Sequence, residues 1–131
     1  MTTIRYADLV ESVAGALQYI SYYHPADYIE HLARAYELEQ SPAAKDAIAQ
    51  ILTNSKMCAE GRRPICQDTG IVVVLLKIGM HVRWDAEMSV DEMVNEGVRQ
   101  AYSHPDNVLR ASIVADPAGG RKNTRDNTVA K

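Results

Sequence analysis

The sequence feature that most constrains the fold is a run of six apolar residues, Ile71 to Leu76, which directly follows a polar cluster. Four of the six, Ile71 to Val74, are β-branched, and the run is far too short to span a membrane. Such a run predicts a strand that is buried on both faces. Because polar groups beside an apolar interior cost free energy unless they find partners or a ligand, the preceding cluster is a candidate site. Its polar members are Cys66, Gln67, Asp68 and Thr69.

Each residue of this cluster also has an ordinary structural interpretation. Cys66 could be a packed thiol, because a free cysteine behaves as a small apolar group. The stretch Asp68-Thr69-Gly70 could form a common turn, because Asp and Gly satisfy turn geometry. Taken one residue at a time, these interpretations are favoured, and only the complete string indicates a specialised site.

Length and composition indicate one globular domain. The chain has 131 residues, of which 47% are hydrophobic, and this is enough for a substantial core. The N-terminus lacks the basic and apolar segments of a secretory signal, and no apolar run reaches the length of a membrane span. Two cysteines do not make a disulfide framework. We therefore expect a protein of the cytoplasm, which is a reducing compartment, with no membrane partner.

Three amphipathic helices are predicted before the apolar run. The first has apolar residues at three- and four-residue spacing over 6–20 and should end before Pro25. The second should have Pro25 at its first position, where the missing N–H matters least. The third should follow Ser41 as N-cap and end within 56–60. The inward face of the second helix is expected to consist of Ile29, Leu32, Ala33 and Tyr36.

After the apolar run, the sequence predicts a turn, a second strand and a fourth helix. The stretch Lys77–Met80 contains a glycine suited to a two-residue hairpin turn, so His81–Trp84 is interpreted as the returning strand. Ser89 and Glu92 fit a capping box. An apolar stripe with helical spacing follows them, so the fourth helix should continue to about Ser103.

Charge, amides and glycine dominate the C-terminal part of the chain. Residues 113–115 could form a short strand, whereas 117–131 is almost without apolar residues and is predicted to be mobile. Four basic residues stand there against one acid, but without aromatics they only weakly support nucleic acid as a partner. We divide the chain into a helical layer (1–60), a strand–helix core (61–116) and this tail. The predicted fold class is α/β (α+β), with helices packed on a small mixed sheet.

The string Cys66-Gln67-Asp68-Thr69-Gly70 resembles the motif of the class I, iron-sulfur-dependent fumarate hydratases and of the related tartrate dehydratase α-subunits. The similarity continues in Asp106–Ser112 and Arg121–Thr128 and covers the chain from about Ser41 onward. It implies a hydro-lyase that reversibly hydrates fumarate to malate, a reaction of the tricarboxylic acid cycle. It also implies a [4Fe-4S] cluster, in which one open iron acts as a Lewis acid, and a homodimer.

The resemblance gives roles to four residues. Cys66 would be one of three cysteine ligands of the cluster. Gln67 and Asp68 would contact the substrate, and Asp68 would also act in catalysis by bonding the hydroxyl or water and helping to move its proton. Arg110 would grip a substrate carboxylate, a task that suits the planar fork of a guanidinium.

A cluster held by three thiolates cannot be completed within this sequence, which contains only two cysteines. The second, Cys58, lies outside the ligand pattern of the family and is interpreted as a helix-end packing residue. We therefore interpret the chain as an N-terminal fragment of a larger enzyme that is inactive alone. The missing ligands would come from the rest of the enzyme or from a second subunit.

Several alternatives remain open. A sibling dehydratase acting on tartrate or on a methylated fumarate would use the same residues, and the chain by itself could be a non-catalytic module that docks a partner. A zinc site built from Cys58, Cys66 and His81 is disfavoured, because seven residues between cysteines is not a usual zinc spacing. The stretch Gly119–Thr124 superficially resembles a phosphate loop but lacks the earlier glycine that such a loop requires.

Overall fold

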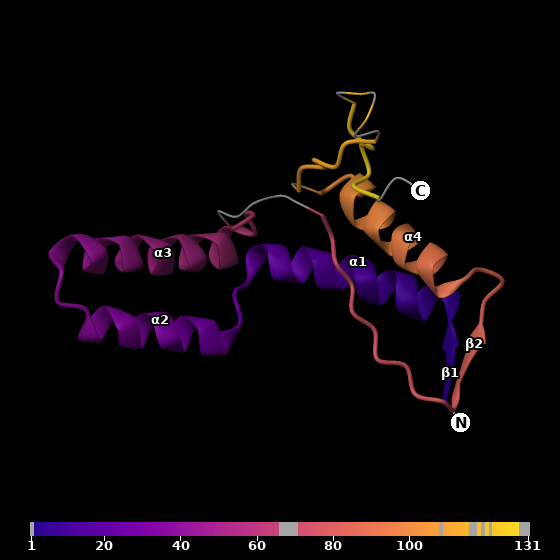
Figure 1. The fold of residues 1–131 in the computed structure, drawn as a ribbon, viewed down its shortest axis with the longest axis horizontal. Helices are drawn as coiled ribbons and strands as arrows, with labels where there is room; N and C mark the ends of the chain where they lie inside the picture. Colours follow the sequence, from indigo (N-terminus) through magenta and orange to yellow (C-terminus); the bar gives the residue numbers. More distant parts are fainter. Residues whose placement is uncertain are drawn as a thin grey trace. The chain divides into compact units, whose positions relative to one another are not determined.

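The computed structural model describes residues 2–65, 71–107, 109–115, 118, 120 and 122–128. Its elements are β1 (Thr2–Arg5), α1 (Tyr6–Tyr22), α2 (Ala26–Leu38), α3 (Pro42–Gly61), β2 (Val82–Asp85) and α4 (Val90–Ser103) (Figure 1). The predicted α/β class is confirmed. The chain forms two compact units: the first holds residues 1–18 and 68–131, and the second holds 19–67. No described helix is long and apolar enough to cross a membrane.

The second unit contains α2 and α3, which run antiparallel as a helical hairpin (Figure 1). Both helices were predicted, although Pro25 is the N-cap of α2 and not its first residue. Ser41 is the N-cap of α3 with an extended backbone, but its side chain makes no capping hydrogen bond. The predicted inward face of α2 is only partly covered, because Leu32 is half-buried and Tyr36 is exposed.

The core of the first unit lies between α1 and α4. Its buried cluster consists of Val13 and Leu17 from α1 with Val98 and Ala101 from α4. The predicted capping box begins α4: the Ser89 hydroxyl accepts a hydrogen bond from the Glu92 N–H, and the Glu92 carboxylate accepts one from the Ser89 N–H at 2.9 Å. The amphipathic pattern and this cap together fix where α4 starts and which face it buries.

Gly97 allows α1 and α4 to approach closely. A Cβ atom built on Gly97 would lie 2.7 Å from the Val13 Cβ and 2.9 Å from the Val10 carbonyl oxygen. Both distances are shorter than van der Waals contact, and one partner is backbone that cannot move aside. Only glycine fits at this position without pushing the two helices apart.

Substitution of glycine by alanine should therefore have opposite effects in the two helices. We expect Gly97→Ala to lower the free energy of unfolding by about 1–3 kcal/mol, the usual cost of overpacking a core. Gly15→Ala in α1 is the matched control, since nothing lies within 4 Å of its added Cβ. It should raise stability by roughly 0.5–1 kcal/mol, because alanine favours helix. Urea titrations of both variants measure this, and equal stabilities would show that the contact between α1 and α4 is wrong.

The described sheet is a parallel pair rather than the predicted mixed sheet. Strand β1 pairs with β2 in a register that runs from Thr2 opposite Val82 to Arg5 opposite Asp85. Strand β1 was not predicted from the sequence, and it ends where α1 begins. There the Asp8 carboxylate accepts hydrogen bonds from the Arg5 N–H at 2.9 Å and from the Arg5 guanidinium at 2.7 Å. These bonds hold the pKa of Asp8 down at about 2.

The prediction of a strand at Ile71–Leu76 that is buried on both faces is wrong. Residues 71–79 carry no strand pairing among the described part of the chain, and the strand at β2 pairs with β1 instead of returning along this segment. Its side chains alternate: Val72 packs against the core cluster, whereas Val73 is 76% exposed and Leu75 is 92% exposed. The segment therefore covers the core with one face only, because neither of the described strands pairs with it.

Candidate functional site

The centre of the predicted site, Cys66 to Gly70, lies outside the described residues. Of the four residues with predicted roles, the structure therefore places only Arg110, and it does not place Cys66, Gln67 and Asp68 relative to it. The residues that flank the string and the loop around Arg110 are described. They show how the chain arrives at the string and how it presents the arginine.

The chain leaves α3 through a left-handed turn and is then fastened to α1. Arg62 has φ 47° and ψ 50°, and the N–H of Arg63 donates to the Cys58 carbonyl at 3.1 Å. This arrangement closes the C-terminal end of a helix and redirects the chain. Ile65, the last described residue before the string, is 5% exposed, and its N–H donates to the Ser21 carbonyl at 2.9 Å. The N-terminal side of Cys66 is thus anchored.

Cys58 occupies the helix-end packing position that was predicted for it. It is 4% exposed, and its Sγ lies 3.4 Å from the Pro64 carbonyl, to which it donates a weak hydrogen bond. The rival zinc site also required Cys66, which lies outside the described residues. Within the part of the chain that is described, no three His, Cys, Asp or Glu side chains are grouped so that they could hold a metal ion.

Asn107 holds the loop on the N-terminal side of Arg110. Its Nδ2 donates to the carbonyls of Tyr102 and Leu109, both at 3.0 Å, and its Oδ1 accepts from the Leu109 N–H at 2.9 Å. Gln18 of α1 adds a bond from its Nε2 to the same Oδ1 at 3.1 Å. One amide therefore ties the residue directly before Arg110 to the end of α4.

Asn127 holds the C-terminal side of the same loop. It is 1% exposed, and its Oδ1 accepts from the backbone N–H groups of Ser112 at 2.9 Å and Ile113 at 3.2 Å. Its amide also hydrogen-bonds the Tyr102 hydroxyl. Burial raises the pKa of the Tyr102 phenol, and this hydrogen bond offsets part of the rise. The phenol is therefore neutral near pH 7 and can serve as a partner for the amide.

The chain around Asn127 is shaped by local hydrogen bonds. Asn127 has φ 59°, in the left-handed region that asparagine tolerates better than most residues. The Asp126 carboxylate accepts from the N–H of Thr128 at 3.1 Å and from its hydroxyl at 2.7 Å. Burial alone would raise the pKa of Asp126, but these bonds outweigh it and hold that pKa below its usual value.

A short bridge adds to these contacts. Val114 pairs with Asn123 in an antiparallel arrangement, in which the Ala115 N–H donates to the Lys122 carbonyl at 2.8 Å. This isolated bridge lies where a short strand was expected, at 113–115. The bridge and Asn127 together fasten residues 122–128, whose composition alone predicts mobility, to the loop that carries Arg110.

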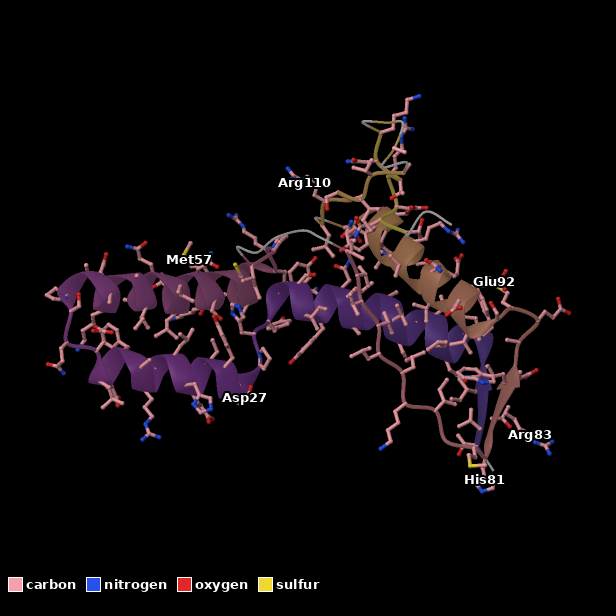
Figure 2. All side chains as sticks on the ribbon, viewed as in Figure 1. Asp27, Met57, His81, Arg83, Glu92 and Arg110 are labelled. Atoms are coloured by element: carbon pink, nitrogen blue, oxygen red, sulfur yellow. The ribbon has the colours of Figure 1, made fainter. Side chains whose placement is uncertain are left out.

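The guanidinium of Arg110 is available to a ligand. Arg110 is exposed, and Figure 2 shows its side chain projecting away from the ribbon. It has no hydrogen-bond or ion-pair partner among the described residues. The backbone on both sides of it is fixed, so little order has to be gained when its charged end binds an anion. Arg110 was predicted from the sequence, whereas neither asparagine was, although each lies within a stretch that carries the resemblance.

A hollow of about 550 Å³ in the second unit borders Ile65 but does not offer a second anion site. His24 lies in its wall, where its Nδ1 is 3.0 Å from the Ser55 hydroxyl and its ring stacks on Tyr28. The described residues of its wall include no lysine or arginine that could compensate the charge of a dicarboxylate. The lining residues are His24, Tyr28, Ala47, Gln50, Ile51, Asn54 and Ile65.

Comparison with known proteins supports the resemblance. A family model described as fumarate hydratase (Fumerase) matches residues 10–131. A protein of Methanocaldococcus jannaschii named "Putative L(+)-tartrate dehydratase subunit alpha" is 38% identical over 79 residues. That match covers 60% of this chain and 28% of the relative, so the chain corresponds to a minor part of that protein.

Proposed function

This chain belongs to the fumarate hydratase family, and on that premise we propose that it forms part of a hydro-lyase that reversibly adds water to fumarate to give malate. The observation that carries the proposal is the family match over 10–131, which includes the string Cys66-Gln67-Asp68-Thr69-Gly70. The presentation of Arg110 supports it, because an exposed arginine on a fixed loop suits the binding of a small dianion.

Arg110 would bind one carboxylate of the substrate. Its planar fork can donate to both carboxylate oxygens at once, which sets the orientation of the substrate as well as its affinity. The loop is held by Asn107 before the arginine and by Asn127 after it. Since the backbone is already in place, binding costs less conformational entropy than it would on a loose loop.

Gln67 and Asp68 would complete the contacts that this chain makes to the substrate. The Gln67 amide can donate to a carboxylate, and the Asp68 carboxylate can accept a hydrogen bond from the hydroxyl or the incoming water. Hydration places a hydroxyl on one alkene carbon and a proton on the other. Asp68 would hold the water and help to move its proton, while the group that exchanges the carbon-bound proton would lie elsewhere in the enzyme.

The residues of this chain fit only part of a [4Fe-4S] cluster. Cys66 offers a soft thiolate of the kind that such clusters take. Cys58 is the other cysteine in the sequence, and its sulfur is buried against the Pro64 carbonyl. Cys66 would therefore be one ligand, and the others would come from other parts of the enzyme or from a partner subunit. When bound, the cluster would supply a Lewis-acidic iron for the hydroxyl.

A second candidate function is the dehydration of tartrate. The relative from Methanocaldococcus jannaschii is named for that activity, and the chain residues proposed here would serve any hydroxy-dicarboxylate. A methylated fumarate is a third possibility of the same class. These substrates differ by one group, and none of the residues with a proposed role distinguishes them.

Parallel assays of the complete enzyme test the proposal. The protein would be reconstituted anaerobically and supplied with L-malate, L-tartrate and mesaconate in separate reactions. We expect malate to be dehydrated with the largest kcat/KM. Brisk turnover of tartrate without malate dehydration would replace the first candidate by the second, and no turnover of any of them would refute the hydro-lyase proposal.

Expressed as these 131 residues alone, the protein should have no hydratase activity. The reason is that one thiol cannot hold the proposed cluster, which takes three. An anaerobic fumarate hydration assay checks this against the complete enzyme at equal concentration, and measurable activity of the chain alone would contradict the ligand count.

In the cell we propose a cytoplasmic homodimer of the tricarboxylic acid cycle. The rival interpretation is a non-catalytic module, which predicts a complete gene product without turnover.

A further inference from the structure

The loop around Arg110 is held by two asparagine side chains, Asn107 and Asn127, and both of them hydrogen-bond Tyr102. Asn107 reaches the Tyr102 carbonyl, and Asn127 reaches the Tyr102 hydroxyl. Tyr102 lies in the last turn of α4, whose inner face packs on α1. The position of Arg110 is therefore set by a well-packed helix through two side-chain amides, although the arginine itself is exposed.

We propose that Asn127 is a positioning residue that holds Arg110 where it can bind a substrate carboxylate. The inference rests on the proposed function, because that function is what requires Arg110. The Oδ1 of Asn127 accepts from the N–H groups of Ser112 and Ile113, which lie two and three residues after Arg110. Without these bonds, the described side-chain contacts to the backbone beside Arg110 would be that of Asn107 with Leu109 and that of Asn123, whose Nδ2 donates to the Ala111 carbonyl at 3.2 Å.

The chemistry of the position favours asparagine. The side chain must accept two backbone N–H groups through one oxygen and donate to a phenol, and an amide does both. The residue must also have φ 59°, which asparagine tolerates. It is 1% exposed, and a side chain without these bonds would leave the partly buried backbone N–H groups of Ser112 and Ile113 without this partner. A buried amide with a left-handed backbone costs free energy, and this cost is understandable if the residue has to fix a functional loop.

Two glycine substitutions separate the side chain from the backbone conformation. Asn127→Gly keeps the left-handed backbone and removes the amide. Arg125→Gly is the matched control, because Arg125 is exposed, lies in the same segment and has a comparable φ of 69°. In the complete enzyme, we expect Asn127→Gly to raise KM about tenfold, which is less than the roughly 10²-fold effect that a 1 Å misplacement can have. Arg125→Gly should leave KM unchanged. Asn127→Asp should recover most of the loss, because its carboxylate keeps both acceptor bonds but cannot donate to the Tyr102 hydroxyl.

A double substitution distinguishes positioning from a general structural role. If Asn127 acts through Arg110, then Asn127→Gly should not raise KM further once Arg110→Ala is present. An additional tenfold rise in that background would overturn the inference, as would an unchanged KM in the single variant. If Asn127→Gly does not fold, Tyr102→Phe serves instead, with an expected rise of about threefold that also disappears beside Arg110→Ala. Failure of the wild-type enzyme to turn over any dicarboxylate would instead refute the proposed function.

Discussion

Replacement of Cys66 by serine is expected to abolish the hydratase activity of the complete enzyme, whereas replacement of Cys58 should leave most of it. The proposed role of Cys66 is to hold iron through a thiolate. A serine hydroxyl is a hard and neutral oxygen at pH 7 and is a poor ligand for an iron–sulfur cluster. Substitution of a residue that only hydrogen-bonds a metal ligand already lowers metal affinity or activity about 10- to 100-fold. We therefore expect the loss of a direct ligand to lower kcat by more than about 10²-fold.

Cys58→Ser is the matched control for this prediction. The Cys58 sulfur is buried and makes a weak hydrogen bond to the Pro64 carbonyl, which a serine hydroxyl can also form. Both variants would be reconstituted anaerobically and assayed for fumarate hydration beside the wild type. A well-folded but inactive Cys58→Ser protein, or an active Cys66→Ser protein, would mean that the wrong cysteine has been assigned to the cluster.

The second large effect is expected at Arg110. Each hydrogen bond to a charged group contributes about 1.5–3 kcal/mol, and a guanidinium can make two of them to a carboxylate. Arg110→Ala should therefore raise KM for malate at least about 10²-fold. Arg110→Lys keeps the charge but loses the planar fork, so it should recover only part of the loss. Steady-state kinetics of the complete enzyme measures both variants.

Arg83→Ala is the control for Arg110. Arg83 is also an exposed arginine of the first unit, but it lies on β2, where Figure 2 shows it on a different element from Arg110. Its removal subtracts the same charge from the protein and should leave KM nearly unchanged. Equal effects of the two substitutions would indicate a general electrostatic influence on substrate binding, and a small effect of Arg110→Ala would refute its role.

The helices could be predicted from the sequence because their signals are local. The capping box at Ser89 and Glu92 and the apolar stripe that follows it place α4 correctly. The strands could not be predicted in the same way, because pairing depends on residues far apart in the chain. The six apolar residues from Ile71 look like a buried strand, yet β2 pairs with Thr2–Arg5, about eighty positions away in sequence.

The same distinction between local signals and contacts between distant residues applies to the candidate site. Arg110 could be named because it stands in a stretch that resembles the family, but the sequence gives no geometry for it. The roles of Asn107 and Asn127 depend on which backbone groups their amides reach, and Asn127 reaches residues 14 and 15 positions away. A signal was present, since both asparagines lie within stretches that resemble the family. Without the fold, however, they could be interpreted only as turn or tail residues.

The measurement that tests the central claim most directly is the iron and acid-labile sulfide content of the complete protein, purified under anaerobic conditions, with and without Cys66. We expect about four iron and four sulfide per active site in the wild type and a large loss of both in Cys66→Ser. A complete protein that contains no iron, or a Cys66→Ser variant that retains as much as the wild type, would contradict it.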